Sequence, residues 1–483
     1  MKLYTSLEKT LTAVKKALPS PDILTYRFTV GRKEYAVVYA DGLSDKELIG
    51  EQIIRPLSTA PYPKTLSSAA KKLFCPEVKE ERDVVTLTDA ILGGDCVVFA
   101  DGTSGALIVG LRKYTLRAVA EPPTSTVIKG PREGFIEDMK TNASLLRRRL
   151  KSPDLMLTPV TVGKYSQTAV TLCYLSSVVK KGLVERIQNK LNLIDIDGII
   201  DSSYLTRFLS ARKDSIFRQV GTTEKPDVLA AKLLEGRVGI LVDGSPIALT
   251  LPYVVLEDFQ SPEDYFNSSA RATVSRMLRI AAILLSVLLP ALFVSAQLFH
   301  LQLIPLNFLL TIVNSIKGIP LSPSFEMFFT LLIFEILNEA SVRMPKYVGM
   351  ALSIVGALVL GDTAVRAGIV STPTIMIMAL SGISMYTVPE LVETFSLLRI
   401  AFLFLAGSLG SYGIIAGGAF LLVYLVTLEN FGVPVLSPYA PLIASDLKDS
   451  VFKGHLTEMR TRPESIGSPN RVRYRKKPKK EDV

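Results

Sequence analysis

The stretches IAAILLSVLLPALFVSAQLFH (residues 280–300) and LRIAFLFLAGSLGSYGIIAGGAFLLVYLVT (residues 398–427) decide the fold of this chain. Each has the length and apolarity of a helix that crosses a hydrocarbon core of about 30 Å, which takes roughly 20 residues. Two more apolar segments, at 347–367 and 372–389, lie between them. The sequence therefore predicts a polytopic α-helical transmembrane domain with four spans, at about 280–301, 347–367, 372–389 and 398–427.

Six spans are the alternative. Residues 306–316 are too short to cross and lie between Pro305 and Pro320, which favours a re-entrant or interfacial helix. Residues 325–343 are long enough to cross but charged, and the glycines within 398–427 allow a kink or a break into two. The charges of residues 325–343 are Glu326, Glu335, Glu339 and Arg343.

Basic residues flank the apolar block on both sides. Arg271, Arg276 and Arg279 precede it, and a basic run at 460–480 follows it. Positive charge beside a span is typical of the cytoplasmic face, so both termini are expected in the cytoplasm and the number of spans is expected to be even. No signal peptide is visible, and residues 1–20 predict an amphipathic surface helix.

Residues 1–279 have the composition of a water-soluble α/β protein and contain an internal repeat. ILGGDCVVFADG (91–102) and LLEGRVGILVDG (233–244) both run from a helix end through a glycine and a buried strand to an Asp-Gly turn. Gly94 aligns with Gly236, and Val98 aligns with Ile240. We therefore predict two related α/β subdomains joined by a helix at 137–150, with chance similarity as the alternative.

The predicted fold class is a cytoplasmic N-terminal α/β domain of two subdomains, followed by a polytopic α-helical transmembrane domain. The expected boundaries are 1–150 for the first subdomain with its linker helix and 151–260 for the second. Residues 261–445 are expected to form the transmembrane domain, and 446–483 a basic cytoplasmic tail.

Composition excludes several classes of protein. The net charge of +10 lies largely beside the membrane block, where it suits anionic lipid headgroups, so no nucleic-acid partner is predicted. Cys75, Cys96 and Cys173 are odd in number and form no close pair, which argues against a disulfide framework or a zinc site. His300 and His455 fit no metal or triad pattern, and no nucleotide-binding loop is present. We predict no enzyme activity, no metal site and no cofactor.

The polar residues of segment 325–343 are the first candidates for a pore or ion pathway. Glu335, Asn338 and Glu339 lie on one helical face, with Arg343 one turn further along. Ionised groups at bilayer depth persist where they face protein or water. The face either lines an aqueous pathway for cations or forms a structural Glu339–Arg343 pair on a surface helix.

The next span offers further pathway candidates. Its small residues allow close helix packing, either in a ring of several chains around a gateable pore or within one chain. Val355, Val359 and Asp362 are placed near this pore. Asp362 and Arg366 are four residues apart and can pair.

A dense motif, GPREGFIED at 130–138, lies between the two subdomains. A Gly-Pro turn there leads into a helix with acidic residues in its first turns. Arg132, Glu133 and Glu137 are candidates for a gating or coupling latch, together with Arg343 and Arg366 in the membrane block. The alternative is a helix cap with solvated charges.

Five segments of the chain resemble the A subunit of GerA-type spore germination receptors, over about residues 89–442. They are GPREGFIEDMKTNASLLRRRL (130–150), GRVGILVDGSPIAL (236–249), SPEDYF (261–266), RMPKYVGMALSIVGALVLGDTAVRAGIVS (343–371) and FGVPVLSPYAPL (431–442).

This resemblance implies a multi-pass protein of the inner membrane of bacterial spores. It implies a homo-oligomer that forms a cation channel, opened by nutrient binding, together with a transporter-like B subunit and a lipoprotein C subunit. By position, Glu335 and Glu339 match the family's acidic intramembrane stretch, and 355–362 falls where a pore helix is expected.

The hypothesis from the sequence is therefore a germinant receptor subunit that releases monovalent ions. Two alternatives stay open. One is the accessory stage V sporulation paralogue, which amplifies ion release, and the other is a non-conducting scaffold that clusters receptors.

Overall fold

The computed structural model describes residues 3–60, 62–63, 65–112, 129–343 and 361–474. Within these ranges the chain forms two compact units. The α/β unit contains residues up to 254 together with 429–448 and the residues from 454 onward. The helical unit contains residues 255–428 and 449–453.

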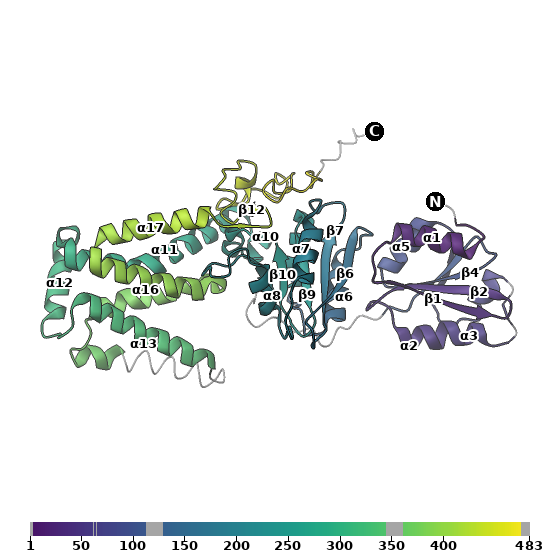
Figure 1. Ribbon diagram of the computed structural model, residues 1–483, viewed down its shortest axis with the longest axis horizontal. Helices are drawn as coiled ribbons and strands as arrows, with labels where there is room; N and C mark the ends of the chain where they lie inside the picture. Colours follow the sequence, from purple (N-terminus) through teal and green to yellow (C-terminus); the bar gives the residue numbers. More distant parts are fainter. Residues whose placement is uncertain (1–2, 61, 64, 113–128, 344–360, 475–483) are drawn as a thin grey trace. The chain divides into compact units, whose positions relative to one another are not determined.

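The first half of the α/β unit is a five-stranded antiparallel sheet in the order β1-β2-β4-β5-β3. Helices α1 (Leu7–Ala17) and α5 (Val84–Leu92) cover one face of this sheet, and a group of short helices covers the other (Figure 1). The strands are β1 Ile23–Val30, β2 Lys33–Ala40, β3 Val78–Glu81, β4 Cys96–Ala100 and β5 Ala106–Val109. The short helices are α2 Lys46–Leu48, the π-helix η1 Ile49–Ile54, α3 Arg55–Ser58 and α4 Leu66–Ala70.

The second half repeats this architecture, with a sheet in the order β6-β7-β9-β10-β8. Apolar side chains of α6 (Met139–Arg149) and α9 (Pro226–Glu235) pack on one face, and those of α7 (Leu183–Asn192) and α8 (Ser202–Leu209) pack on the other. The strands are β6 Leu155–Val162, β7 Thr168–Leu175, β8 Gly221–Thr223, β9 Val238–Val242 and β10 Ala248–Leu251.

The identical strand order confirms the predicted internal repeat. Val98 of β4 pairs with Leu107, and Ile240 of β9 pairs with Leu249 in the same place. The aligned glycines have nearly the same backbone conformation, with φ of 96° at Gly94 and 104° at Gly236. The residues aligned from sequence are therefore structurally equivalent.

Helix α6, which we expected to link the subdomains, is the first helix of the second repeat. It has 11 residues, as does α1, and its Leu145 and Leu146 belong to the core of the second sheet. Likewise, α1 buries its apolar stripe in the core of the first sheet. Its amphipathic pattern is that of the predicted surface helix, with the apolar side packed on the sheet.

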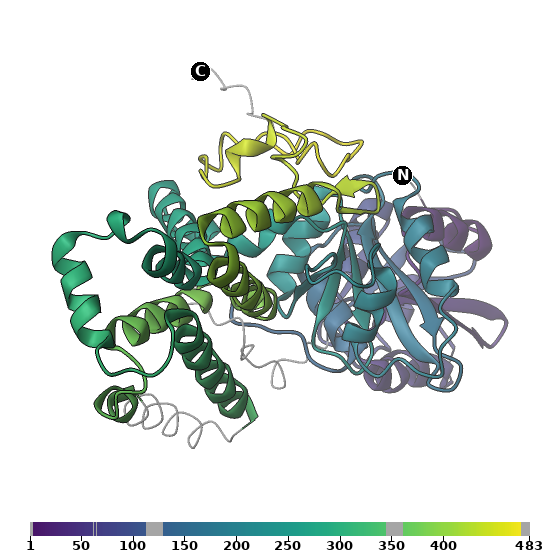
Figure 2. The same cartoon turned by 60° about the vertical axis from the view of Figure 1, so that its left-hand side comes forward.

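The helical unit is a bundle in which α11, α13, α16 and α17 lie alongside one another (Figures 1 and 2). Its longer helices are α11 Ser269–Phe299, α12 Leu306–Ile316, α13 Pro323–Arg343, α15 Thr372–Met385, α16 Val392–Leu409 and α17 Ser411–Val426. Its short helices are η2 Val255–Phe259, α10 Glu263–Phe266, η3 Leu301–Leu303 and η4 Pro389–Leu391.

Two of the described helices are long and apolar enough to cross a membrane, namely Ser269–Phe299 and the segment Pro389–Leu409. The predicted span at 398–427 is broken at Gly410, because its φ of 63° and ψ of −141° end α16 before α17 begins. The break leaves α17 with 16 residues, and α15 has 14, so both are shorter than the roughly 20 residues of a typical span. Most of the predicted span at 347–367 lies outside the described residues.

The C-terminal region, expected as a tail from residue 446, is folded as far as it is described. Strands β11 (Glu429–Asn430) and β12 (Val433–Pro434) form a small ladder, and a 3-10 turn η5 spans Asp446–Lys448. Arg462 donates to the carbonyl oxygen of Leu234, and Ser468 donates to that of Val178. These contacts hold the segment against the second repeat.

Candidate functional site

A buried ion pair lies inside the helical bundle. Glu335 on α13 accepts a hydrogen bond from Nη2 of Arg399 on α16 at 2.5 Å and another from the Ser396 hydroxyl at 2.6 Å. The Arg399 side chain is fully buried, and that of Glu335 is 26% exposed. Removing one partner of such a pair leaves an uncompensated charge away from water. Glu335 is therefore held by its own chain.

Other groups complete the environment of Arg399. Its Nη1 donates to Ser381 on α15 at 3.2 Å, and its guanidinium lies 5.5 Å from the centre of the Phe334 ring. Its Nε is buried and has no hydrogen-bond acceptor among the described residues. The cluster thus ties α13, α15 and α16 together.

Asn338 lies one turn from Glu335, as its spacing predicts, but its partner comes from another part of the chain. The hydroxyl of Tyr386 donates to Asn338 Oδ1 at 2.7 Å. The Nδ2 group of Asn338 is buried without an acceptor among the described residues. A polar site between helices is suited to a water molecule, because the unused N–H group can donate to its oxygen.

The remaining acidic candidates lie on the outside of the single chain. Glu339 pairs with Arg343 at 2.5 Å, and Asp362 pairs with Arg366 at 2.8 Å. All four side chains are more than half exposed. These are the helical pairs expected from their spacing, and the structure does not bring them to Glu335. Val355 and Val359 lie outside the described residues.

A second buried carboxylate, Glu326, holds two helices together, and sequence analysis did not predict this role. It is 1% exposed, and its Oε1 accepts from both the backbone N–H and the hydroxyl of Ser371 at 2.6 Å. Ser371 is the N-cap of α15. Glu326 therefore joins the first turn of α13 to the N-terminus of α15, where negative charge is favoured.

Another ion cluster forms where α11 begins. Asp264 accepts from Arg276 Nε at 3.0 Å and from both terminal nitrogens of Arg279, at 2.8 and 2.9 Å. Asp449 from the C-terminal segment binds Arg276 Nη1 at 2.9 Å. Arg276, which the sequence placed in the basic flank of the apolar block, is 1% exposed.

The cluster has a defined charge state. Burial raises the pKa of Asp264, but its hydrogen bonds and attraction to Arg279 and Arg276 lower it more, so the pKa lies below its usual value. Asp264 is therefore ionised at neutral pH and fixes α10 and the segment around Asp449 to the first turns of α11.

The predicted latch residues lie in the α/β unit. Glu133 binds Arg149 at 2.8 Å and Arg148 at 3.4 Å, whereas Arg132 is exposed. Glu137 lies before α6, and its carbonyl oxygen accepts from Gly244 N at 2.9 Å. The helix begins at Met139, and the stretch 131–136 has no regular secondary structure. The structure brings Glu133 to α6 but does not join the three residues in one cluster.

A buried ion pair between the two repeats was not anticipated. Arg147 on α6 is 1% exposed and donates to both carboxylate oxygens of Asp22, at 2.8 and 2.7 Å. A bidentate pair of this kind fixes orientation as well as distance. The sequence showed only the run of three arginines at 147–149, and such a run more often lies on a solvated face.

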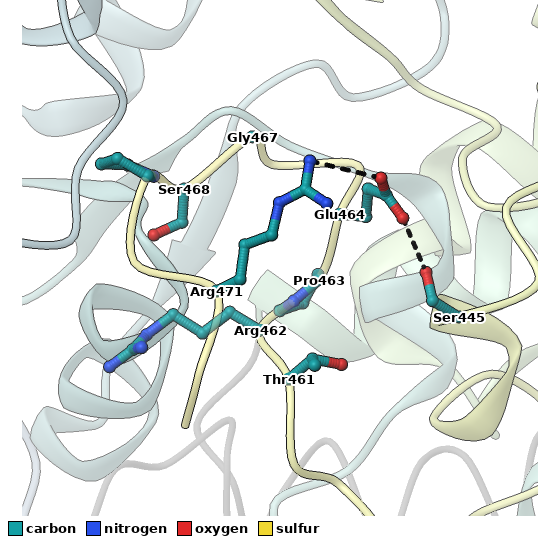
Figure 3. Close-up of a pocket in the computed structure, with 9 residues that line it drawn as sticks. Ser445, Thr461, Arg462, Pro463, Glu464, Gly467, Ser468 and Arg471 are labelled. Atoms are coloured by element: carbon teal, nitrogen blue, oxygen red, sulfur yellow. Dashed lines mark hydrogen bonds and ion pairs between the residues drawn. The ribbon is translucent and has the colours of Figure 1, made fainter. Parts of the chain in front are cut away.

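A pocket of about 310 Å³ lies in the C-terminal segment of the α/β unit (Figure 3). Arg471 pairs with Glu464 on one side of it, and Glu464 also accepts from Ser445. Arg462 points away to the carbonyl oxygens of Leu234 and Val472. The charges of Arg462, Glu464 and Arg471 at the pocket thus already have partners within the α/β unit. Elsewhere in the described ranges, no three acidic, His or Cys side chains converge as metal ligands do.

The whole chain was compared with known proteins. The family model for the Bacillus/Clostridium GerA spore germination protein matches residues 9–465. The chain belongs to this GerA family. The resemblance seen in the sequence motifs is thereby confirmed.

Relatives within the GerA family cover most of the chain. Spore germination protein KA of Bacillus subtilis (strain 168) is 35% identical, over 98% of this chain and 88% of that protein. The uncharacterized membrane protein YfkQ of the same organism is 33% identical, over 92% and 87%. A crystal structure of the N-terminal domain of the A subunit of the Bacillus megaterium spore germinant receptor GerK3 is 27% identical. It covers 52% of this chain and 96% of that chain, with a TM-score of 0.42.

Proposed function

We propose that this chain is the A subunit of a nutrient receptor in the spore inner membrane, and that several copies form a gated cation channel. Release of monovalent ions through the channel starts germination. The proposal rests on GerA-family membership over nearly the whole chain. The helical unit supports it, because two of its helices suit a bilayer and it holds a buried charge pair, which is costly at bilayer depth without a role.

In this proposal the α/β unit and both termini face the cytoplasm. The chain acts with a transporter-like B subunit and a lipoprotein C subunit, and nutrient binding favours the open state by its higher affinity for that state. Arg132, Glu133 and Glu137 couple the α/β unit to the gate, with Glu133 acting through α6.

The acidic residues divide into two roles. Glu339 and Asp362 are exposed on a single copy, so they line the ion pathway only where copies meet, with Arg343 and Arg366 setting their charge at the gate. Glu335 and Asn338 support the pathway from inside the bundle. Val355 and Val359 are assigned to the pore from their sequence position alone.

The first test is potassium release from dormant spores lacking this gene, challenged separately with amino acids and with sugars. Loss of release for one nutrient class, restored by the wild-type gene, is the expected result. Slower release for every nutrient would instead indicate the amplifying paralogue. Unchanged release with both nutrient classes would contradict a channel and favour the scaffold.

The second test separates the two roles. Glu339→Gln with Asp362→Asn should change the rate of potassium release at an unchanged protein level, because both groups are exposed. Glu335→Gln should lower the protein level, because Arg399 then lacks its counter-charge. Normal release kinetics in the Glu339/Asp362 double variant would refute the pathway assignment.

A further inference from the structure

The two repeats carry the same three-residue turn in the same place. Ser20-Pro21-Asp22 follows α1 and leads into β1, and Ser152-Pro153-Asp154 follows α6 and leads into β6. The turns are equivalent because the helices and strands on either side are equivalent in the repeat. Their surroundings differ.

The first turn is occupied by the second repeat. Asp22 binds Arg147 of α6 through both oxygens, and the Ser20 hydroxyl accepts from the backbone N–H of Leu157 on β6 at 3.1 Å. Close by, Gly42 lies against α6, and a Cβ on it would be 3.2 Å from the Lys140 carbonyl oxygen. The first turn and the neighbouring Gly42 thus contact helix α6 and the edge strand β6 of the second repeat.

The second turn is open in the single chain. Pro153 is exposed, and Asp154 is half-buried. Asp154 Oδ2 accepts from Ser177 of its own repeat at 2.6 Å. Ser177 occupies the place of Gly42 and is itself exposed. A carboxylate has room for further donors beyond this one hydrogen bond.

The complementary surface is open at the other end of the α/β unit. By the repeat, Lys15 of α1 stands where Arg147 stands in α6, and Thr25 of β1 stands where Leu157 stands in β6. Thr25 pairs with Val38 as Leu157 pairs with Cys173. Lys15 and Thr25 are both exposed, and β1 is an edge strand of its sheet.

We propose that the Ser152-Pro153-Asp154 turn of one copy binds α1 and β1 of a second copy of this chain. Lys15 Nζ donates to Asp154, and the N–H of Thr25 donates to the Ser152 hydroxyl, which continues the contact between the repeats from one chain to the next. This interface is head-to-tail, so it builds a ring when its rotation closes.

The contact is weaker than the one within the chain, for two reasons. Lysine offers a point charge where arginine binds both carboxylate oxygens. Ser177 also adds a side chain where Gly42 has none, which holds α1 slightly further away. The inference therefore rests on the proposed homo-oligomer, whose helical units keep the copies close enough for a weak contact to form.

The test uses two differently tagged full-length copies in the same membrane, each with Cys75→Ser. One carries Lys15→Cys and the other Asp154→Cys, and both are treated with a short thiol cross-linker. Burial raises the pKa of Cys96 to about 12, and Cys173 is fully buried, so neither is expected to react. Lys79→Cys, on the opposite edge strand β3, replaces Lys15→Cys in the control.

We expect a cross-linked heterodimer, about ten-fold more abundant than in the control, because a formed contact gives the thiols a local concentration near the millimolar range. An oligomer that persists in native mass measurements while the cross-link stays at the control level would overturn this docking mode alone. A monomer in those measurements would overturn both the docking mode and the proposed homo-oligomer.

Charge reversal gives a second, independent readout. A Thr12→Cys and Ser177→Cys pair reports the same interface with Lys15 and Asp154 both in place, since these positions match Ser144 and Gly42, which lie together within the chain. The Ser177 hydrogen bond to Asp154 is absent from every arm of this comparison, so only the charges at positions 15 and 154 differ between arms. Lys15→Glu should lower this cross-link several-fold, and adding Asp154→Lys should restore it. A cross-link insensitive to both changes would refute the Lys15–Asp154 contact.

Discussion

The two α/β repeats have the same sheet order but different exposed edges. In the second repeat, β6 and α6 are covered by the turn at Ser20 and Asp22, and Arg147 is buried. In the first repeat, the equivalent Lys15 is exposed to solvent. Two repeats with the same fold can therefore differ in the stability that equivalent charges contribute. The position of each repeat in the chain decides which of its charges is buried.

Breaking the Arg147–Asp22 pair should have the largest effect. Arg147→Ala should lower the free energy of unfolding by about 3–5 kcal/mol, because it leaves Asp22 without its counter-charge in a largely buried site. Peptide-level hydrogen exchange of the full-length protein in detergent would report the loss in both repeats.

Lys15→Ala is the matched control for Arg147→Ala. It should change stability by less than about 0.5 kcal/mol, as surface substitutions usually do. Equal losses of unfolding free energy in the two variants would show that positions 15 and 147 contribute equally to stability, which would contradict the difference between the repeats.

The next effect concerns one buried polar side chain in each repeat, Thr10 on α1 and Asn142 on α6. Each side chain holds the segment that precedes its helix. Asn142 bonds both the N–H and the carbonyl oxygen of Ile136, whereas Thr10 donates to the carbonyl oxygen of Tyr4. Asn142→Ala should cost about 1–3 kcal/mol and Thr10→Val about 1 kcal/mol, since the first removes two hydrogen bonds and the second removes one. Thermal unfolding followed by circular dichroism measures both variants, and a larger loss in Thr10→Val would contradict this order.

Substitutions at Gly42 and at the equivalent Ser177 test how closely a helix packs beside each of the two turns. Gly42 has φ of 78° and faces the Lys140 carbonyl oxygen, so Gly42→Ala should cost about 1–2 kcal/mol from its left-handed backbone alone. Ser177→Ala should cost less, because an exposed hydrogen bond contributes about 1 kcal/mol or less. Chemical denaturation compares the two variants. A neutral Gly42→Ala would contradict the left-handed backbone at this position, because that conformation by itself accounts for the expected cost.

The smallest expected effect is a difference in pH response. In the second repeat Asp201 caps α8, and in the first Thr65, which does not titrate, caps α4. Burial raises the pKa of Asp201, but hydrogen bonds from Ser245 and Ser203 lower it more, so its pKa in the folded protein lies below the usual value.

A lowered carboxyl pKa stabilises the fold above the pKa of the unfolded chain, and this contribution is lost as the pH falls through the folded value. Exchange protection of α8 should therefore weaken below about pH 4, where unfolded aspartate titrates. Asp201→Asn keeps a capping oxygen and should remove this dependence, while α4 serves as the internal control. An unaltered pH profile in Asp201→Asn would refute the assignment.

Much of the fold was predictable from local patterns. The aligned glycines and buried strands predicted the repeat, because period and turn chemistry are encoded within a dozen residues. Strands β3, β6 and β8 were not predicted. β8 has only three residues, and β6 contains Pro159, which is typical of an edge strand and weakens a strand pattern.

The candidate site was predicted only in part. Glu339–Arg343 and Asp362–Arg366 follow from a four-residue spacing along one helix. Glu335 was selected for its depth in the apolar block, but its partner Arg399 is on another helix, 64 residues away. A lone arginine in an otherwise apolar span was the available signal, because such a charge needs a partner.

The sequence by itself determined the class of the protein: two α/β repeats, an apolar helical unit and the GerA family. These features are written in composition, periodicity and short motifs, which depend on residues close together in the chain. Only the tertiary structure decided which charges are buried. Asp22, Asp264 and Glu335 each meet their arginine through packing of separate elements, so the energy of each pair is a property of the fold.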